Sequence, residues 1–403
     1  MLAIISVFFV LLMCCQEGLV SYIDGYGFDT PLNGFHLTQA IPQAIIHIGP
    51  HKAASTYIQS ELVSLTKELA NANYFWPTRK DGSLMGTKEI SSFAFAVRGL
   101  LPAPEPVMST MGSFLQHSLR NNHNIIMSSE EFDDANATHV ATLKNHLQGF
   151  NVTIVFVYRE LLAQLISLHF ETNRFEHEDF VKFSTSFSGF LFRMLDTIPQ
   201  MLKPAEAVKI YADVFGVERM RVIDLLGVAA AREDVVHVLL CKIGGVLCHY
   251  KGFPQLNTNT GTPVHLSNSA YSLLPAQVFS FYKSYLERQH NNTCRICGSV
   301  LQEYHRFTAR YKEHLKVHAP PAITTTKLSF LVPLSQQADA TLRDTYGSAI
   351  LYSNRTANLQ AMSKVQVFEI DPEFFMMDVY WNEWIHLEYE TARADKKLCG
   401  CKV

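Results

Sequence analysis

The chain has 403 residues, of which 48% are hydrophobic and 18% are charged, and its formal net charge is −3. This length is enough to bury a sizeable core, either as one large domain or as two smaller ones. The near balance of charge excludes a global attraction to nucleic acid, so any site for an anion has to be local.

The N-terminus is typical of a targeting segment. Residues 2–15, LAIISVFFVLLMCC, contain no charged side chain. A helix that spans a membrane needs about 20 apolar residues. This run is shorter, so the sequence favours a signal peptide over residues 1–18. Because no basic residue precedes the run, a short uncleaved anchor is an alternative, and a buried helix is another. We therefore expect entry into the secretory pathway, with a location in the Golgi lumen or membrane or outside the cell.

Glycosylation triplets and cysteines agree with that location. The triplets begin at Asn136, Asn151, Asn291 and Asn354. The cysteines outside the leader are Cys241, Cys248, Cys294, Cys297, Cys399 and Cys401. Their even number suits disulfides in an oxidising lumen, although the sequence does not choose the pairing. Residues 294–297 and 399–401 could instead supply four thiolates to zinc, but the leader favours disulfides.

Short apolar runs alternate with helical patterns from residue 44 onward, which predicts βαβ units and a parallel sheet. The first strand is expected at 44–49 and a helix at 55–70. The apolar face of this helix consists of Ile58, Leu62, Leu65 and Leu69. A short second strand is expected at 73–77, and a third at 124–132, where it runs into a polar turn.

The middle of the chain continues the same alternation. Residues 152–158 are largely apolar, as expected for a central parallel strand that is covered on both faces. One helix is expected from about Glu160 and another from Pro204, which Gly216 ends. A fifth strand is expected at 220–226.

The periodicity weakens after about residue 245. Helices are expected at 270–288 and 299–316, and an aromatic segment at 367–386 is expected to pack back on the domain. The sequence thus predicts one α/β domain over residues 40–360, with three layers and a central parallel sheet, followed by a C-terminal extension over 361–403.

The segment between the first strand and helix, IIHIGPHKAASTY at 45–57, is a variant phosphate loop. A Walker A loop reads G-x-x-x-x-G-K-[ST], and here Gly49 and Thr56 take its two ends. Ala54 replaces the second glycine, and Lys52 comes three places early. Backbone N–H groups in a strand-loop-helix form an anion cradle. A lysine at the middle of this loop suits an anion that is shorter than a triphosphate.

KAAST at 52–56 resembles the K-[TS]-G-[TS]-[TS] loop of the sulfotransferase family, with Ala54 in place of the central glycine. The resemblance implies a P-loop-like α/β/α fold, and a donor, 3′-phosphoadenosine-5′-phosphosulfate, whose 5′-phosphosulfate binds this loop. The implied donor-binding residues here are Lys52, Ala53, Ala54, Ser55 and Thr56. Alanine adopts positive φ less readily than glycine.

A second motif carries the resemblance further. In VYRELLAQLISLHF, Arg159 follows a strand and Ser167 comes eight residues later, as in the family's site for the 3′-phosphate. Arginine can form a fork to phosphate oxygens. The family often has R-[DN]-P where this chain has Arg159-Glu160-Leu161. The resemblance covers about residues 44–228 and a further stretch, 342–359, that we expect to be helical. Taken one at a time, Arg159 could be an arginine in a surface ion pair, and Ser167 could be an ordinary serine of a helix.

Sulfuryl transfer needs a base for the acceptor's proton and positive charge on the leaving phosphate. Lys52 is the expected group at the leaving phosphate, and the family's base is a histidine or a glutamate. Our preferred base is Glu130, at the end of the third strand, where ligands bind in open α/β sheets. The other candidates are Glu131, His51 and His169, and His47 is expected to be a core histidine. No metal is expected, because a sulfuryl group carries less charge than a γ-phosphate.

We therefore expect a sulfotransferase that acts on a hydroxyl or amine of a carbohydrate or glycoprotein, with protein tyrosine as a lesser option. Its partners would be that acceptor and no nucleic acid, with a possible N-terminal membrane anchor; the oligomeric state is left open. One alternative is a secreted binding protein that keeps the fold without turnover. Another is a P-loop kinase or ATPase, in which Asp224 of a D-x-x-G stretch would help to hold the metal.

Overall fold

The computed structural model describes residues 41–174, 187, 190–191, 203–250, 252–253, 300–318, 323–327, 331–363, 366–370 and 377–394. The leader, the helix expected at 270–288, and the cysteines from Cys294 onward with their zinc alternative lie outside the described residues, as does the sequon at Asn291. Within the described part, no helix is both long enough and apolar enough to cross a membrane.

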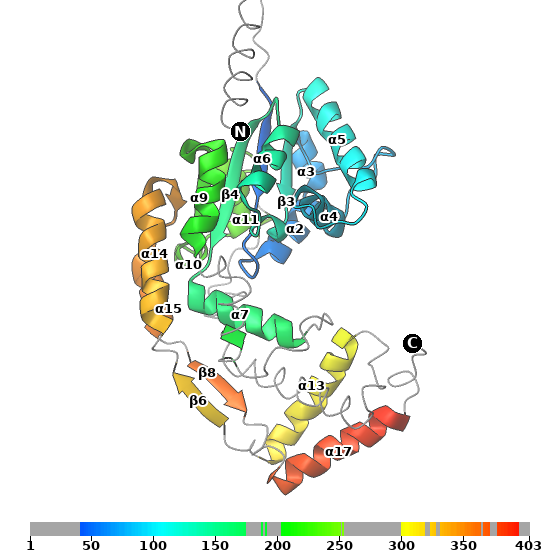
Figure 1. Cartoon of the computed structure of the whole chain (residues 1–403), viewed down its shortest axis with the longest axis vertical. Coiled ribbons are helices and arrows are strands. Elements are labelled where there is room, and N and C mark those ends of the chain that lie inside the picture. The colour runs from blue at the N-terminus through cyan, green and yellow to red at the C-terminus, as the bar shows by residue number, and fades with distance from the viewer. Residues whose placement is uncertain are drawn as a thin grey trace, which may run out of the picture. The chain divides into compact units, whose positions relative to one another are not determined.

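A six-stranded parallel sheet forms the centre of the fold (Figure 1). In sheet order its strands are β2 (Tyr74–Phe75), β3 (Asn124–Ser128), β1 (Gln43–His47), β4 (Asn151–Tyr158), β5 (Met220–Asp224) and β7 (Ile350–Leu351). The predicted α/β class with a central parallel sheet is therefore confirmed. The chain leaves β1 first toward β2 and β3 and later toward β4, so the strand order reverses at β1, where open α/β sheets bind ligands.

Register and burial explain why the site lies where it does. His47, the last residue of β1, pairs with Ser128 of β3 and Val155 of β4. Because all the strands run in the same direction, the segments that follow β1, β3 and β4 meet at one edge of the sheet. From Ile154 to Tyr158, β4 is fully buried, as predicted for a central strand.

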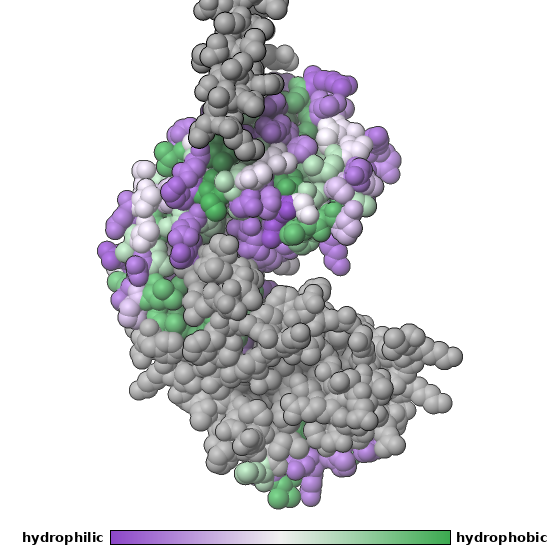
Figure 2. All heavy atoms as spheres, viewed as in Figure 1, coloured by the Kyte–Doolittle hydropathy of each residue, from purple (hydrophilic) through white to green (hydrophobic). Residues whose placement is uncertain are grey.

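Helices cover both faces of the sheet. On one face α6 (Ala137–His146) lies between α4 (Thr87–Val97) and α9 (Pro204–Phe215) and contacts both. On the other face α2 (Ser55–Ser64) contacts α3 (Thr66–Asn71) and α11 (Val235–His237). The right-handed rule for parallel crossovers places α2 and α3 opposite α4, α6 and α9, because the chain crosses the sheet in one direction from β1 to β2 and in the other direction from β2 onward. α5 (Glu105–Arg120) packs on α4. Figure 2 shows a mixed described surface, with hydrophilic residues between smaller hydrophobic patches.

The predicted helices are largely confirmed. The helix expected at 55–70 is divided into α2 and α3 at Leu65, and its four predicted core residues are buried. α9 begins at Pro204 and ends before Gly216, whose φ is 99°. α7 (Leu161–Arg174) and α13 (Val300–Val317) also lie where the sequence placed helices.

The expectation of helix throughout 342–359 is wrong. α14 (Val332–Tyr346) and α15 (Arg355–Ser363) are separated by β7, which pairs with β5 through Val222 and Ile350. β2 is equally short, but Pro77 ends its apolar run, whereas β7 stands between two helical patterns and merges with them in the sequence. Another pairing that the sequence did not predict joins β6 (Ile323–Lys327) to β8 (Gln366–Ile370) in antiparallel register.

The aromatic segment expected at 367–386 divides into β8 and the start of α17 (Val379–Ala394). Trp381 and Trp384 of α17 are buried against α13, where the ring centroids of Tyr311 and Trp381 are 5.4 Å apart. Among the cysteines that the structure describes, Cys241 and Cys248 form a disulfide.

Candidate functional site

The loop between β1 and α2 contains three residues with positive φ: Gly49 at 99°, Lys52 at 65° and Ala54 at 68°. A Cβ added to Gly49 would lie 3.1 Å from Cα of Glu130, so the close approach of the loop to the turn after β3 requires glycine. Ala54 adopts the left-handed conformation that strains an L-residue by about 1–2 kcal/mol. The loop therefore turns tightly between β1 and α2, with strained backbone at Lys52 and Ala54, and the binding of an anion in this cradle stays a prediction.

The amino end of α2 completes this cradle. No side chain caps the helix at Ala54, and its first turn contains no acidic residue. The first N–H groups of a helix lack partners within the helix, which makes its amino end a site for anions. Oγ of Ser55 donates a hydrogen bond to the carbonyl oxygen of Pro50 at 3.2 Å and fixes the loop from inside, whereas Thr56 is exposed. These residues fit a phosphate or sulfate group.

Arg159 follows β4 directly and lies against the loop. Its Nη1 donates a hydrogen bond to the carbonyl oxygen of Lys52 at 2.6 Å. The side chain is 7% exposed, and its Nε is buried with no hydrogen-bond partner among the described residues. Burial lowers the pKa of Arg159 to about 10, so the guanidinium is charged at neutral pH. A buried cation with an unsatisfied nitrogen is suited to an anionic ligand.

α7 gives the loop a second support. Nε2 of Gln164 donates a hydrogen bond to the carbonyl oxygen of His51 at 3.1 Å, from a side chain that is buried. Ser167 is also buried, one turn further along α7. The structure thus places Ser167 on the helix that begins beside Arg159. Its contact with a 3′-phosphate stays a prediction.

Glu160 accounts for the departure from the family's R-[DN]-P pattern. Its two carboxylate oxygens accept hydrogen bonds from the N–H groups of Leu162 at 2.7 Å and Ala163 at 2.9 Å, so it caps the amino end of α7. Oγ of Ser335 in α14 donates to the same carboxylate. Glu160 therefore fixes the start of the helix that carries Gln164 and Ser167.

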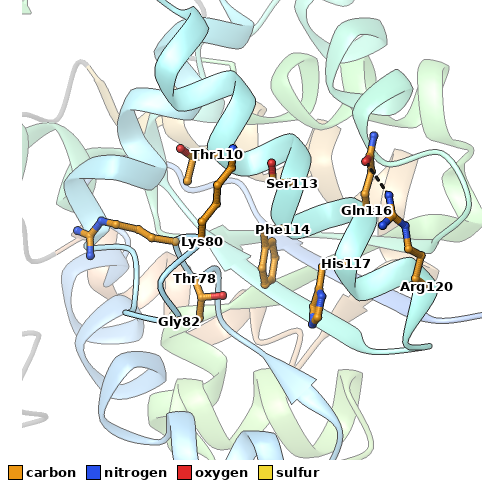
Figure 3. Close-up of a pocket in the computed structure, with 10 residues that line it drawn as sticks. Thr78, Lys80, Gly82, Thr110, Ser113, Phe114, Gln116, His117 and Arg120 are labelled. Carbon is orange, nitrogen blue, oxygen red and sulfur yellow. Dashed lines mark hydrogen bonds between the residues drawn. The ribbon is translucent and has the colours of Figure 1, made fainter.

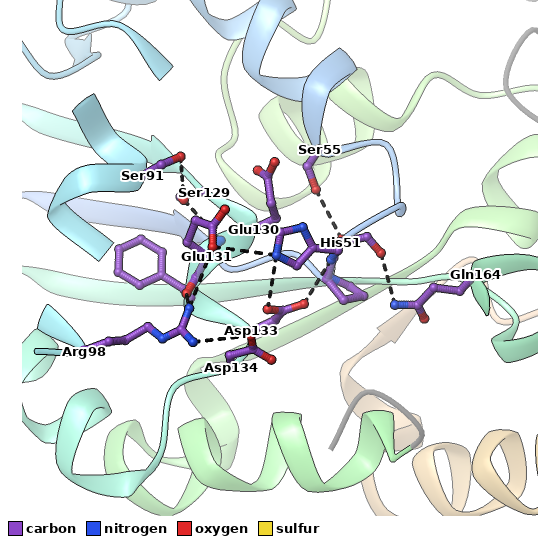
Figure 4. Close-up of polar contacts among 12 residues, drawn as sticks. His51, Ser55, Ser91, Arg98, Ser129, Glu130, Glu131, Asp133, Asp134 and Gln164 are labelled. Atoms are coloured by element: carbon purple, nitrogen blue, oxygen red, sulfur yellow. Dashed lines mark hydrogen bonds and ion pairs between the residues drawn. The ribbon is translucent and has the colours of Figure 1, made fainter. Parts of the chain in front are cut away.

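The turn after β3 brings acidic side chains to the loop (Figure 4). It includes the 3₁₀ helix η1 (Glu130–Phe132), and its carboxylates are Glu130, Glu131, Asp133 and Asp134. The carboxylate of Glu130 accepts a hydrogen bond from Nε2 of Gln59 in α2. Arg98, which follows α4, donates to the carbonyl oxygen of Glu131 at 2.9 Å and lies 3.3 Å from Oδ2 of Asp134.

His51 lies among these carboxylates. Its Nε2 is 3.8 Å from Oε2 of Glu131 and 3.9 Å from Oδ1 of Asp133. Burial alone would lower the pKa of His51, but the charges of Asp133, Glu131 and Glu130 outweigh it and raise that pKa above its ordinary value. Burial raises the pKa of Asp133 to about 7, although the His51 charge opposes this shift. His51 and Asp133 therefore keep their protons to a higher pH than the same groups do in water.

The other candidate histidines are core residues. His47 is fully buried at the end of β1, where its Nδ1 lies 2.7 Å from Oγ of Ser128, and burial lowers its pKa to about 4. The prediction of a core histidine is confirmed. His169 is also buried, and its ring centroid is 5.3 Å from that of Phe187 and 5.1 Å from that of Phe190.

Asp224 has a structural role in the fold. It is fully buried at the end of β5, and its Oδ1 accepts the N–H of Gly227 at 3.1 Å. Its Oδ2 accepts three hydrogen bonds, from Arg343 Nη2, the N–H of Asn354 and Asn358 Nδ2. These four bonds, one on Oδ1 and three on Oδ2, hold the carboxylate within its own fold. Elsewhere in the described ranges no group of three or more His, Cys, Asp or Glu side chains is arranged to hold a metal.

Sequence reasoning missed four residues of the site: Gln59, Arg98, Asp133 and Gln164. The two glutamines were detectable, because each is a polar residue at a buried position of an amphipathic helix. Asp133 stands in the acidic run EEFDD, which by itself is typical of a solvated turn. Arg98 is separated by more than 30 residues of sequence from its partners in η1 and the following turn, and no local pattern connects them.

A comparison of the chain with protein-family models, with curated proteins and with solved structures finds no match.

Proposed function

We propose that the chain is a sulfotransferase that moves a sulfuryl group from 3′-phosphoadenosine-5′-phosphosulfate to a hydroxyl or amine of a carbohydrate or glycoprotein. The observation that carries the proposal is the 2.6 Å hydrogen bond from Arg159 to the carbonyl oxygen of Lys52. The motifs of the resemblance, more than 100 residues apart in the sequence, lie together at the carboxyl ends of neighbouring strands. A chance likeness in two unrelated segments would not require this contact.

The loop and Arg159 would divide the donor between them. The backbone N–H groups at the start of α2 and the Lys52 ammonium would hold the 5′-phosphosulfate, and the Arg159 guanidinium with Ser167 would hold the 3′-phosphate. In the transfer, the acceptor oxygen or nitrogen forms a bond to sulfur as the bond from sulfur to the bridging oxygen breaks. The electron pair of that bond leaves with the 3′,5′-bisphosphate. Lys52 would offset the charge that develops there.

Glu130 is the base that the geometry supports best. Gln59 orients its carboxylate, which is half-buried at the edge of the cradle. His51 has a raised pKa, so it keeps its proton to a higher pH than an ordinary histidine and is less available to accept another proton at neutral pH. We therefore assign the removal of the acceptor's proton to Glu130. His51 would have a positioning role.

The two alternatives make different demands on the same residues. A magnesium-dependent kinase would need Asp224 for its metal, but that carboxylate already accepts four hydrogen bonds from its own fold. A binding protein without turnover is favoured by the strained φ of Ala54. The Cys241–Cys248 disulfide supports an oxidising compartment for either a transferase or a binding protein.

The proposal is tested on the full chain, produced in a secretory host, by titrating 3′-phosphoadenosine-5′-phosphate against its unfolding temperature. A ligand that binds only the folded state stabilises it by about 2.7 kcal/mol at a hundredfold over Kd. We expect this shift with the bisphosphate but not with AMP, and its loss in Lys52→Ala and Arg159→Ala. Lys242→Ala, at an exposed position outside the site, is the matched control.

Transfer itself is measured with radiolabelled donor and a mixture of carbohydrate and glycoprotein acceptors. Wild-type protein should transfer label, and Glu130→Gln should bind the bisphosphate as the wild type does but transfer at least about a hundredfold more slowly. Bisphosphate binding without any transfer would favour the binding protein. No shift with the bisphosphate, or an equal one with magnesium-ATP, would overturn the proposed donor site.

A further inference from the structure

A cavity lies between α5 and the loop that precedes α4 (Figure 3). Its volume is about 460 Å³, within the range of about 300–1,000 Å³ that is usual for small-molecule sites. The residues around it are Thr78, Arg79, Lys80, Gly82, Thr110, Ser113, Phe114, Gln116, His117 and Arg120. None of them belongs to the loop at 49–56, the turn after β3 or α7. The cavity is therefore distinct from the candidate donor site.

One face of α5 supplies most of the cavity's polar groups. Thr110, Ser113, His117 and Arg120 follow one another at intervals of three and four residues, so they lie on one side of the helix. A polar helix face is usually just solvated. Here, however, the loop at 78–82 lies over that face, and Figure 3 shows Lys80 extending from the loop toward α5.

The loop is held in place by its own hydrogen bonds. Nε of Arg79 donates to Oε1 of Glu89 at 2.9 Å, and its Nη1 donates to the carbonyl oxygen of Leu84 at 2.9 Å. Oδ1 of Asp81 accepts the N–H of Ser83 at 2.9 Å and also its hydroxyl. The charge of Arg79 is thus balanced by Glu89, and Asp81 is occupied within its own turn.

The remaining charge around the cavity is positive. Lys80 and Arg120 have no ion pair with any residue that the structure describes, and Arg120 donates only to the neutral amide of Gln116 at 3.3 Å. No aspartate or glutamate is among the residues around the cavity. Phe114 is 6% exposed, so it offers too little ring surface to stack a nucleotide base. The hydrogen-bond donors around the cavity suit a ligand that has both anionic groups and many hydroxyl groups.

We propose that this cavity binds a short acidic oligosaccharide, with Lys80 and Arg120 on its sulfate or carboxylate groups and the hydroxyls of Thr110 and Ser113 on the sugar. The inference does not depend on the proposed transfer activity, because the cavity shares no residue with the candidate donor site. It would equally serve an enzyme that holds its acceptor chain at a distance or a protein that only binds glycans.

The test measures binding of a fluorescent, sulfated heparin-derived tetrasaccharide to the full chain at physiological salt, beside the same tetrasaccharide with its sulfates removed. We expect binding of the sulfated probe, at least tenfold weaker binding after Lys80→Ala with Arg120→Ala, and a similar loss in Ser113→Glu. The charge-matched control is Lys242→Ala with Arg355→Ala, two exposed cations that do not line the cavity. Unfolding temperatures of all variants establish that each is folded.

Each other outcome overturns the proposal. An equal loss in the control pair would mean that the probe binds surface charge in general. Unchanged binding in the Lys80/Arg120 variant would place the probe elsewhere, and absence of binding would exclude this ligand class. If ADP displaced the probe, with the displacement lost in the same variant, the cavity would be a nucleotide site instead.

Discussion

The backbone N–H of His51 donates a hydrogen bond to Oδ2 of Asp133 at 3.0 Å, and the ring of the same histidine lies 3.9 Å from the other oxygen of that carboxylate. This contact fixes the loop after β1 against the turn after β3. Asp133 is buried, so it is stable there only with a proton or beside the charge of His51. The geometry of the loop and the proton content of the site are therefore linked.

We expect the contribution of Asp133 and His51 to the stability of the protein to fall as the pH rises toward neutrality. In the unfolded chain the pKa of Asp133 is about 3.8, whereas burial raises its pKa in the folded state to about 7. Between these values the folded state binds more protons. The free energy of unfolding then falls with rising pH, by up to about 1.4 kcal/mol per pH unit for one proton. His51, whose pKa is raised above 6.5, adds an effect of the same sign at higher pH.

Asp133→Asn isolates this effect, because its amide oxygen can still accept the N–H of His51. In urea titrations between about pH 4 and pH 8, the variant should gain stability over wild type as the pH rises and then level off. The control is Asp213→Asn, an exposed carboxylate of α9 paired with Lys209, whose effect should stay within about 1 kcal/mol. A constant difference between Asp133→Asn and wild type would contradict the linkage.

Most of the sheet could be predicted from the sequence because its signals are local. β4 is a run of apolar residues long enough to be recognised, and the α9 helix has both a proline at its start and a glycine at its end. β7 was missed because its two residues stand between the helical patterns of α14 and α15, with no breaker such as the proline that follows β2. Its position depends on pairing with β5, more than 120 residues earlier, and such a contact leaves no local pattern.

Ala54→Gly should stabilise the protein. Ala54 has φ 68° at the amino end of α2, and glycine adopts this conformation without strain. The relief exceeds the entropy that glycine adds to the unfolded chain, so we expect a gain of about 1 kcal/mol in the free energy of unfolding by urea. The matched control is Ala53→Gly, since Ala53 is fully buried and is not among the residues with positive φ. It should lose about 1 kcal/mol, and a loss in both variants would contradict the strain at Ala54.

Gly49→Ala should destabilise the protein by about 2 kcal/mol or more. Its φ is 99°, and the new Cβ would lie 3.1 Å from Cα and 3.4 Å from the carbonyl oxygen of Glu130. Gly99→Ala separates the two causes, because Gly99 has φ 69° but nothing within 4 Å of its added Cβ. That variant should lose only about 1 kcal/mol, from backbone strain alone. Equal losses at both positions would mean that the contact with Glu130 contributes nothing.

The site was harder to predict than the fold. Lys52 and Arg159 stand in short motifs that a family resemblance can detect, and the structure brings their segments together. The groups that hold them in place carry no motif. Gln164 contacts the loop across more than 100 residues of sequence, and Arg98 reaches the turn after β3 from the position that follows α4. Such supporting contacts depend on packing, and only the folded chain shows them.

Glu160 and Ser335 allow the support of α7 to be measured directly. The Glu160 carboxylate accepts hydrogen bonds from the N–H groups of Leu162 and Ala163, in the first turn of α7. It also accepts one from the buried hydroxyl of Ser335 in α14. Glu160→Gln replaces one acceptor oxygen with a donor that faces N–H or O–H groups, so we expect a loss of about 1–3 kcal/mol. Ser335→Ala should lose about 1 kcal/mol, because it removes one donor to a buried carboxylate.

The two changes should not be additive, because both weaken the same hydrogen bond between the Ser335 hydroxyl and the Glu160 carboxylate. We therefore expect a coupling energy of at least about 0.5 kcal/mol in the double-mutant cycle, measured by urea unfolding. Ser60→Ala is the control, since the exposed Ser60 hydroxyl bonds only within its own helix, to the carbonyl oxygen of Tyr57; we expect almost no loss there. Strict additivity of Glu160→Gln and Ser335→Ala would show that α14 does not hold the start of α7. Glu160 would then act as a helix cap alone, and the position of Gln164 beside the loop would depend on α7 and the sheet.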